Sequence, residues 1–363
     1  MRRRLRLKSR FIEPLTQFPI AHTSANRPGP EIPLLPLAKL FSVPFPRPEA
    51  VLVAGNISHD ILVRPVEQFR WGASNWVEHF SEDMGGNGSN TSYTMARLGL
   101  PARLLGMVGP DQRGDGVLTK LDSAGVDTRW VQRSVASTTT TIVIMNRAGD
   151  RQFIQHVGAS HEMFPEPYAF PPEVTAGITH YHQANIFSLP SLRRHGGEQL
   201  RRAKAAGLTT SIDTGWATDS KWVETLAPAF PHCDLLFMNE DEARATTTRD
   251  TPDEMAAALR NLGATDIILK LGPRGCIVYQ GSSTTHIPAF AVTAVDTTGA
   301  GDCFAGAFFA ALHRGHSLTE AARLANAMGA MVVSHIGATT GVTDWDQTLR
   351  FAAHCPVAES LPT

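Results

Sequence analysis

The 363-residue chain lacks features that define several large classes of protein. No apolar run approaches the roughly 18 residues that a membrane-spanning helix needs, so we predict no membrane partner. The four cysteines form no CxxC pair, which argues against a structural zinc site and is typical of a reducing, cytoplasmic location. With a net charge of −1, the chain also lacks the broad positive surface of a nucleic-acid-binding protein.

Several common catalytic motifs are absent as well. The chain contains no Gly-Lys pair and therefore no Walker phosphate-binding loop. It has neither the HExxH zinc motif nor the GxSxG nucleophile turn. The first glycine cluster, residues 85–90, departs from the GxGxxG dinucleotide fingerprint at its last position. These absences argue against a P-loop NTPase, a zinc protease, an α/β-hydrolase and a Rossmann dehydrogenase.

Residues 1–48 differ in composition from the rest of the chain. They hold nine of the 24 prolines and nine Lys or Arg against two acids, which gives a local charge of about +7. Proline removes backbone donors and fixes φ, so regular structure is disfavoured there. We predict a basic, proline-rich, disordered extension over 1–48 and one folded domain over 49–355. An Arg-rich, acid-poor opening is also a feature of transit peptides.

From residue 49 onward, short apolar segments alternate with helical patterns. Several of these segments are apolar almost throughout, which is typical of strands covered on both faces. Capping boxes at Thr251 and Ser317 mark two helix starts. The alternation predicts a three-layer α/β/α fold with a mainly parallel central sheet, and residues 59–84 and 138–160 predict a smaller accessory sheet. The expected strands are Val51–Gly55, Arg103–Val108, Thr141–Asn146, Thr209–Asp213, Asp234–Met238, Ile267–Leu271 and Cys276–Tyr279.

The segment Asp296-Thr-Thr-Gly-Ala-Gly-Asp302 carries the clearest chemical signal. It follows an expected strand, Ala291–Val295, and precedes a segment with one apolar helical face. Gly299 and Gly301 would lie at the N-terminus of this helix and leave its backbone N–H groups accessible. Free N–H groups and the helix dipole there favour an anion such as phosphate. Asp302 is either a capping acid or a general base beside that anion. A base at such a position is what phosphoryl transfer to a hydroxyl needs.

This segment, continued as Asp302-Cys-Phe-x-Gly-Ala, resembles the C-terminal signature of the ribokinase-like (PfkB) sugar and nucleoside kinases. Gly85-Gly86-x-x-x-Asn90 resembles the N-terminal signature of the family. The resemblance covers about residues 50–345 and implies a ribokinase-like fold, with the accessory sheet as a lid over the phosphate acceptor. Further matches follow in the order of the family: Gly109-x-Asp111-x-x-Gly114, Asn239-x-x-Glu242 and Lys270-x-Gly272-x-x-Gly275.

The resemblance implies a carbohydrate kinase that uses ATP and Mg²⁺. Asp302 would accept the proton of the acceptor hydroxyl, and the backbone amides of Gly299, Ala300, Gly301 and Asp302 would form an anion hole. It also implies a monovalent-cation (K⁺) site near Asp296 and Gly337. The remaining implied residues are Asp60, Gly85, Gly86, Asn90 and Asn56 for the acceptor, Lys270, Gly272, Gly275, Thr298 and Asn326 for ATP, and Asn239 and Glu242 for the metal.

Some of these residues also fit purely structural roles. Asn239 and Glu242 fit an acidic helix start, and the glycine cluster with Asn90 fits a turn followed by a helix cap. Asn326 lies in a small-residue helix that also fits close packing. Retired members of such families usually lose the base or the glycines, whereas this chain keeps both. A non-catalytic relative that binds a sugar or a nucleotide remains an alternative.

Departures from the family pattern leave the acceptor open. Position 87 is Asn, where ribokinase-type relatives often carry Lys, and Asp213-Thr-Gly-Trp216 replaces a common Asp-x-Asn-x-Arg. A phosphorylated sugar would need a basic cluster, for which Arg103, Arg147 and Arg151 are the obvious candidates. We therefore expect a small unphosphorylated sugar as the substrate, with a nucleoside as the alternative. Lid sheets of relatives often pair with each other, so a homodimer is also expected.

Overall fold

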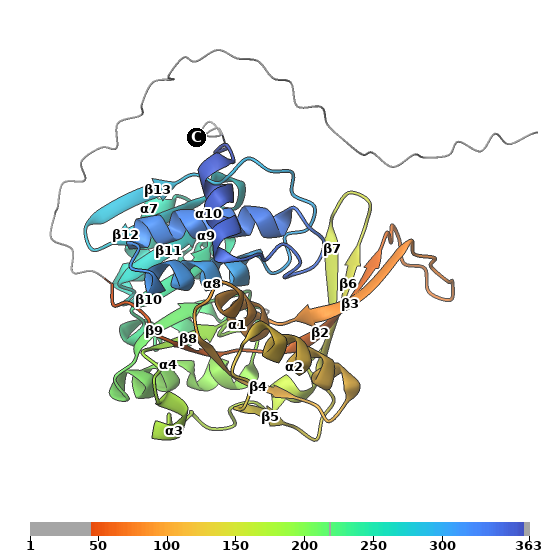
Figure 1. Ribbon diagram of the computed structural model, residues 1–363, viewed down its shortest axis with the longest axis horizontal. Helices are drawn as coiled ribbons and strands as arrows, with labels where there is room; N and C mark the ends of the chain where they lie inside the picture. Colours follow the sequence, from red (N-terminus) through yellow and green to blue (C-terminus); the bar gives the residue numbers. More distant parts are fainter. Residues whose placement is uncertain (1–44, 218, 359–363) are drawn as a thin grey trace, which may run out of the picture. The chain divides into compact units, whose positions relative to one another are not determined.

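The computed structural model describes residues 45–217 and 219–358. The predicted extension, residues 1–48, lies outside the described residues except for its last four. The described strands form a nine-stranded and a four-stranded sheet. Figure 1 shows helices packed against the larger sheet. Seven of the eight expected strands are present within one or two residues of their predicted ends, and the exception is Ala291–Val295. Among the described helices, none combines the length and the apolar character needed to cross a membrane.

The nine-stranded central sheet runs in the order β13-β12-β11-β10-β9-β8-β1-β4-β5. The strands from β11 to β5 are parallel, and β12 and β13 add an antiparallel edge. The carboxyl ends of the parallel strands therefore share one edge of the sheet, which we call the carboxyl edge. The strands are β1 Val51–Ala54, β4 Ala102–Val108, β5 Val131–Arg133, β8 His180–Ala184, β9 Thr209–Asp213, β10 Leu235–Asn239, β11 Asp266–Lys270, β12 Cys276–Gln280 and β13 Ser283–Ile287.

Helices cover both faces of this sheet. In β1, Val51 and Val53 pack into the core on one face, whereas Leu52 and Ala54 pack into the core on the other. This period of two, with both sets buried, is what a doubly covered strand requires. The first face carries α1 Asn87–Arg97, α2 Gln112–Ala124, α8 Ala300–His313, α9 Leu318–Val333 and α10 Trp345–His354, and the second α3 Pro172–Thr175, α4 Pro190–Ala205, α5 Trp222–Leu226, α6 Glu240–Thr247 and α7 Pro252–Asn261.

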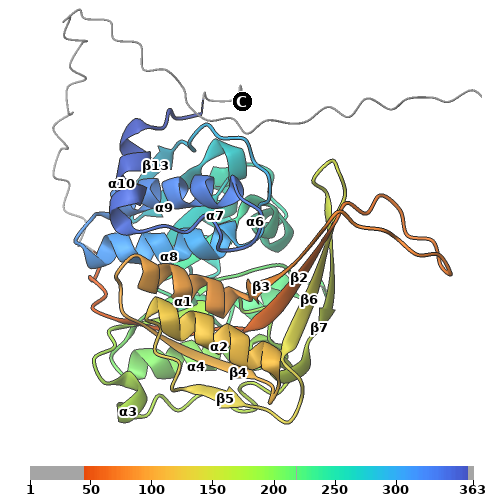
Figure 2. The ribbon, with the colours of Figure 1, turned by 45° about the vertical axis from the view of Figure 1, so that its right-hand side comes forward.

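The four-stranded sheet stands beside these layers, and we call it the lid (Figure 2). Its order is β3-β2-β6-β7, with β2 and β6 parallel and the outer pairs antiparallel. A small core of Leu62, Val143 and Met145 packs against Ile336, from the loop after α9. The predicted three-layer fold with an accessory sheet is confirmed. The lid strands are β2 Ser58–Arg64, β3 His79–Gly85, β6 Thr139–Met145 and β7 Arg151–His156.

The segment before the glycine-rich turn differs from its prediction. Residues 291–295 form no strand, because their backbone groups bond to loops and to the end of α9 instead of to a sheet. The Ala291 amide donates to Pro356 O at 2.8 Å, and the Val295 amide donates to Val333 O at 2.7 Å. The helix that follows begins at Ala300, as predicted. The capping boxes at Thr251 and Ser317 are present too.

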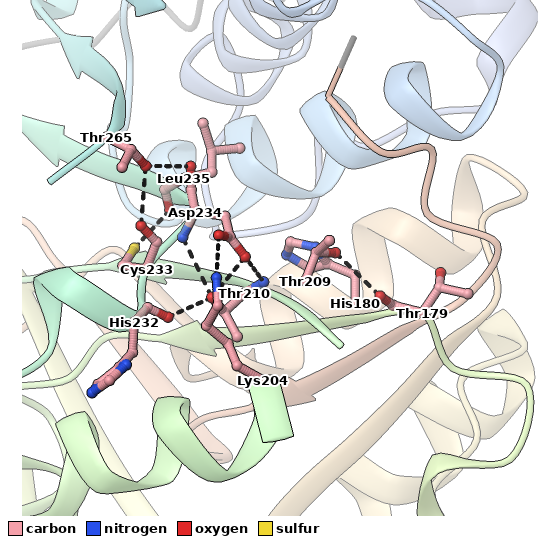
Figure 3. Close-up of polar contacts among 10 residues, drawn as sticks. All are labelled: Thr179, His180, Lys204, Thr209, Thr210, His232, Cys233, Asp234, Leu235 and Thr265. Atoms are coloured by element: carbon pink, nitrogen blue, oxygen red, sulfur yellow. Dashed lines mark hydrogen bonds and ion pairs between the residues drawn. The ribbon is translucent and has the colours of Figure 1, made fainter. Parts of the chain in front are cut away.

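At the opposite, amino edge of the sheet, a polar cluster joins the starts of β9, β10 and β11 (Figure 3). Asp234 accepts hydrogen bonds from the Thr210 amide at 2.9 Å and from the Thr210 hydroxyl at 3.1 Å, and it pairs with Lys204 of α4. Thr210 also donates its hydroxyl to His232 O at 2.5 Å. Since side chains and backbone groups pair throughout this cluster, it fastens neighbouring strands together.

Candidate active site

Asp302 lies in the first turn of α8, beside the start of α1. Gly299 caps α8 in the left-handed region, with φ of 73°, and a Cβ there would lie 2.5 Å from Ala338 O. Glycine is therefore required at this turn. The amides of Gly301 and Asp302 occupy the first turn, where no preceding helical carbonyl is available to accept them. The predicted carboxylate and backbone donors thus share one helix end.

Two asparagines of α1 hold the Asp302 carboxylate. Asn87 Nδ2 donates to Asp302 Oδ1 at 2.8 Å, and Asn90 Nδ2 donates to Asp302 Oδ2 at 2.9 Å. Burial, reinforced by the negative charge of Asp213, raises the pKa of Asp302 to about 6, although the two amides and Lys270 favour ionisation. A carboxyl group with this pKa can both lose and regain a proton near neutral pH.

The glycine cluster makes room for a second carboxylate, that of Asp60 in β2. A Cβ on Gly85 would lie 2.0 Å from Asp60 Oδ2, and Ser58 Oγ donates to Asp60 Oδ1 at 2.7 Å. Burial raises the pKa of Asp60 as well. Gly86 has φ of 94°, and its Cβ would lie 2.5 Å from Asn56 O. The five predicted acceptor residues are therefore clustered around the start of α1.

Asn56 and Asn90 have separate tasks in this cluster. Asn56 Oδ1 accepts from the Asn87 amide at 3.1 Å, so Asn56 caps α1 from outside the helix. Asn90 is 3% exposed, and its Oδ1 has no hydrogen-bond partner. A buried amide oxygen without a donor is unfavourable, and a hydroxyl group of a bound molecule would satisfy it. The cap that the sequence suggested for Asn90 is supplied instead by Asn56.

A Lys–Asp pair spans the carboxyl edge of β9, β10 and β11. Lys270 Nζ lies 2.7 Å from Asp213 Oδ2 and 3.0 Å from Oδ1. A Cβ on Gly301 would lie 3.3 Å from the same Nζ, so the ammonium group faces the start of α8. Burial alone would lower the pKa of Lys270, but the charges of Asp213 and Glu242 raise it above its ordinary value. Lys270 therefore stays positively charged beside the backbone donors.

The predicted metal residues form a capping box at the start of α6. Asn239 Oδ1 accepts from the Glu242 amide at 2.8 Å, and Glu242 Oε2 accepts from the Asn239 amide at 3.0 Å and from Thr214 Oγ1 at 2.7 Å. Burial raises the pKa of Glu242. Asn239 and Glu242 therefore cap the start of α6, which is the structural role that the sequence allowed for them. The same capping box brings the carboxyl group of Glu242 close to Lys270.

The charge balance fits a divalent cation that retains its own water. The negative charges of three carboxyl groups raise the pKa of the single ammonium group of Lys270. They belong to Asp213, Glu242 and Asp302. Within the described ranges, no three His, Cys, Asp or Glu side chains gather closely enough to hold a metal ion directly. Magnesium keeps several waters and needs few protein ligands, so Asn239 and Glu242 suit it through water.

The predicted ATP residues divide between two places. Gly272 and Gly275 shape the turn between β11 and β12, where a Cβ on Gly275 would lie 2.0 Å from Ile287 O. Asn326 Nδ2 donates to the same Ile287 O at 3.1 Å. Lys270 instead faces α8, and Thr298 belongs to the turn before α8, where its hydroxyl donates to Asp296 Oδ1 at 2.7 Å.

Sequence reasoning missed several residues of this cluster. Asn87 was noted only as a departure, yet it holds Asp302, and Asn185 Nδ2 in turn donates to Asn87 Oδ1 at 3.0 Å. Asp213 was likewise a departure without a role. One signal could have found Asp213 and Asn185, since each lies at or just after the carboxyl end of a parallel strand, where ligand sites of open α/β sheets form.

Comparisons with known proteins identify the family of the chain. Residues 50–345 match the pfkB family of carbohydrate kinases. The aminoimidazole riboside kinase of Salmonella typhimurium is 28% identical over 289 residues, which cover 76% of this chain and 90% of that protein. The fructokinase of Vibrio alginolyticus is 29% identical over 282 residues, covering 74% and 91%.

A solved structure extends the comparison to the fold. The ribokinase of Arabidopsis thaliana, complexed with ribose and ATP, superposes with a TM-score of 0.73 at 25% identity and covers 84% of this chain and 99% of that one. The predicted fold class and enzyme class are therefore confirmed. On the match over residues 50–345, the chain belongs to the pfkB family of carbohydrate kinases.

Proposed function

We propose that this kinase transfers the γ-phosphate of ATP to a hydroxyl group of a small, unphosphorylated sugar. The observation that carries the proposal is the position of Asp302, whose carboxylate lies beside the free amides of α8 and has a pKa raised to about 6. In the proposed reaction, an Asp302 oxygen accepts the proton of the acceptor hydroxyl. The acceptor oxygen bonds to the γ-phosphorus as the bond to the β-phosphate oxygen breaks, and ADP leaves.

Backbone amides and Lys270 would stabilise the charge of the transferred group. The anion hole would consist of residues 299–302, with the amides of Gly301 and Asp302 unopposed by helical carbonyls. Lys270 Nζ faces the same helix end, so its charge adds to that of the donors. Mg²⁺, placed through water by Asn239 and Glu242, would supply further neutralisation of the phosphates.

The polar groups near the predicted acceptor residues favour a neutral polyol. Asp60, Glu82 and Asp83 line a cavity between the lid and the loop after α9, where Asp83 pairs with Lys120. The Asp60 carboxylate and the unpartnered Asn90 Oδ1 both accept hydrogen bonds, so donor hydroxyls match them. The lid would cover the bound sugar and exclude water.

The three arginines considered for a phosphorylated substrate are already paired. Arg103 bonds to Asp127, Arg147 bonds to Glu78, and Arg151 bonds to Asp296. A phosphate group on the acceptor would therefore lie near carboxylates, and none of these three guanidinium groups would be free to bind it. This charge distribution supports the unphosphorylated substrate.

An acceptor panel tests the proposal. ADP release would be measured with ATP, Mg²⁺ and a set of ketohexoses, pentoses, keto-deoxy acids, phosphosugars and nucleosides. We expect the highest kcat/KM with one neutral sugar. A preference for nucleosides would favour the alternative within the family, and no turnover with any acceptor would favour a binding protein. The homodimer, the cytoplasmic location and the extension over 1–48 stay predictions.

A further inference from the structure

The buried carboxylate of Asp296 accepts four hydrogen bonds from its own chain. Its side chain has 0% exposure. Oδ1 accepts from the Thr298 amide at 2.9 Å, from the Thr298 hydroxyl at 2.7 Å and from Arg151 Nη1 at 3.0 Å. Oδ2 accepts from the Gly337 amide at 2.9 Å. Four donors, one of them a full positive charge, leave this carboxylate little capacity for another cation.

The positive charge comes from the lid. Arg151 begins β7, and its guanidinium reaches the turn that precedes α8. Besides Asp296, it donates to Thr298 Oγ1 at 3.0 Å and to Thr297 Oγ1. Its side chain is 23% exposed, so its charge is partly shielded from water. One arginine therefore ties the lid to both threonines of the turn.

These residues do not fit a monovalent-cation site at Asp296. A potassium ion would need the carboxylate oxygens that Arg151, Thr298 and Gly337 occupy, and the guanidinium would repel it. The nearby carbonyl of Val333 is also occupied, since it accepts from the Val295 amide at 2.7 Å and from the Asp296 amide at 3.1 Å. The K⁺ site implied by the family resemblance is therefore disfavoured by the side chains present.

We propose that the Arg151 guanidinium takes the place of a monovalent cation, so that this enzyme works without K⁺. The inference rests on the proposed kinase function and names a positioning residue for it. Arg151 neutralises Asp296, and Asp296 and Thr298 fix the turn that leads into Gly299 and the free amides of α8. The same bonds require the lid to lie against the turn, so lid closure and an ordered anion hole occur together.

The electrostatics of the turn agree with this assignment. Burial alone would raise the pKa of Asp296, but the amide of Gly337, both donors of Thr298 and the charge of Arg151 lower it. Asp296 is thus an anion at neutral pH that requires a counter-charge. Gly299, three residues on, is held at φ of 73°, so a loosened turn would directly misplace the α8 amides.

The first test uses the wild-type enzyme. kcat and KM would be measured at constant ionic strength while KCl replaces tetramethylammonium chloride. We expect both constants to change by less than about twofold, because Arg151 already supplies the charge. Activation of several-fold by K⁺ would overturn the proposal without any need for a variant.

The second test uses Arg151→Met, with Arg147→Met as the matched control. Arg147 lies in the same hairpin, but it pairs with Glu67 and Glu78 instead of with Asp296. In tetramethylammonium chloride we expect kcat of Arg151→Met to fall about 10- to 100-fold, as expected for a misplaced anion hole. K⁺ should restore part of this loss, and Arg147→Met should match the wild type. An Arg151→Met variant with unchanged kcat, or one with a loss that K⁺ does not relieve, would contradict the proposal.

A thermal measurement separates this proposal from the kinase proposal. Without any substrate, K⁺ should raise the Tm of Arg151→Met more than tetramethylammonium does, and it should leave the wild-type Tm unchanged. If the acceptor panel shows no turnover, this comparison still decides whether the guanidinium occupies a cation position. If K⁺ changed the Tm of the wild type and of Arg151→Met equally, the guanidinium would not occupy a cation position.

Discussion

The central sheet carries a Lys–Asp pair at each of its two edges, and the pairs have different surroundings. At the amino edge, Lys204 and Asp234 have side chains 39% and 30% exposed, and Asp234 also bonds twice to Thr210 (Figure 3). At the carboxyl edge, Lys270 and Asp213 are 15% and 11% exposed, and two further carboxyl groups lie close to them.

From this difference we expect the amino edge to serve stability and the carboxyl edge to serve the proposed chemistry. At the amino edge, Lys204 pairs with Asp234 and Asp234 bonds to Thr210, so that cluster fastens β9 to β10. The carboxyl edge instead gathers an excess of carboxyl groups, an amide oxygen without a donor and a raised pKa at Asp302. Unpaired polar atoms and shifted pKa values are expected at functional sites, where a bound ligand completes the hydrogen bonds.

The largest expected effect is that of Asp302→Asn at the carboxyl edge. Asparagine cannot accept the acceptor proton as a base, so we expect kcat to fall about 10³-fold while ATP still binds. Because burial disfavours the charged Asp302, the folded state should not lose stability at pH 7. Steady-state kinetics, ATP titration and urea unfolding measure these three quantities. A variant that keeps its rate would refute the role of Asp302 as the base.

The two lysines provide a matched comparison of the edges. Lys270→Met removes the charge that faces α8, and we expect kcat to fall about 10²- to 10³-fold, as for loss of one transition-state donor. Lys204→Met removes the equivalent charge at the amino edge and should leave kcat and KM unchanged. ADP release by both variants under identical conditions measures the contrast. Equal rates for the two variants would show that Lys270 serves only its ion pair with Asp213.

The pH dependence of kcat/KM should be set by groups at the carboxyl edge and not by those at the amino edge. The pKa of Asp302 is raised to about 6, so its basic form prevails above that pH and disappears below it. We expect kcat/KM to fall about tenfold per pH unit below pH 6 and to level off above it. The Lys204→Met variant should keep this profile. A profile that stays flat down to pH 5 would exclude Asp302 as the titrating base.

Local patterns in the sequence predicted the chain segments well. The glycine turn, Asp302 and the capping boxes at Thr251 and Ser317 depend on residues within a few positions of each other, so spacing alone located them. β8 was missed because its buried histidines, His180 and His182, make it look polar. In the fold, both bond to the hydroxyl of Ser211 on β9.

Contacts between distant segments could not be predicted in the same way. Asn87 bonds to Asp302 across 215 positions, and Arg151 bonds to Asp296 across 145. Nothing in the local spacing of either residue indicates its partner, because the register of the sheets decides which ends meet. The strand predicted over 291–295 failed for a related reason, since its apolar residues bond to a helix end instead of to a ladder.

The smallest expected effect tests the amino edge itself through Thr210→Val. Thr210 is fully buried, and its hydroxyl bonds to His232 O and to Asp234. Valine has nearly the same shape, so the variant removes these bonds with little change in packing. Because the hydroxyl has a single proton to share between these two acceptors, we expect the free energy of unfolding to fall by about 1 kcal/mol, the value of one buried hydrogen bond. Urea unfolding measures this change.

The same variant should leave kcat, KM and the pH profile at their wild-type values. The reason is that Thr210 lies near the start of β9 and Asp213 ends it, so a local loss near the start need not displace the other end. A fall in kcat without a fall in stability would show that the amino edge controls the geometry of the site. A loss of stability with unchanged kinetics would show that β9, a strand of five residues, contributes to stability at its start and to the site at its end.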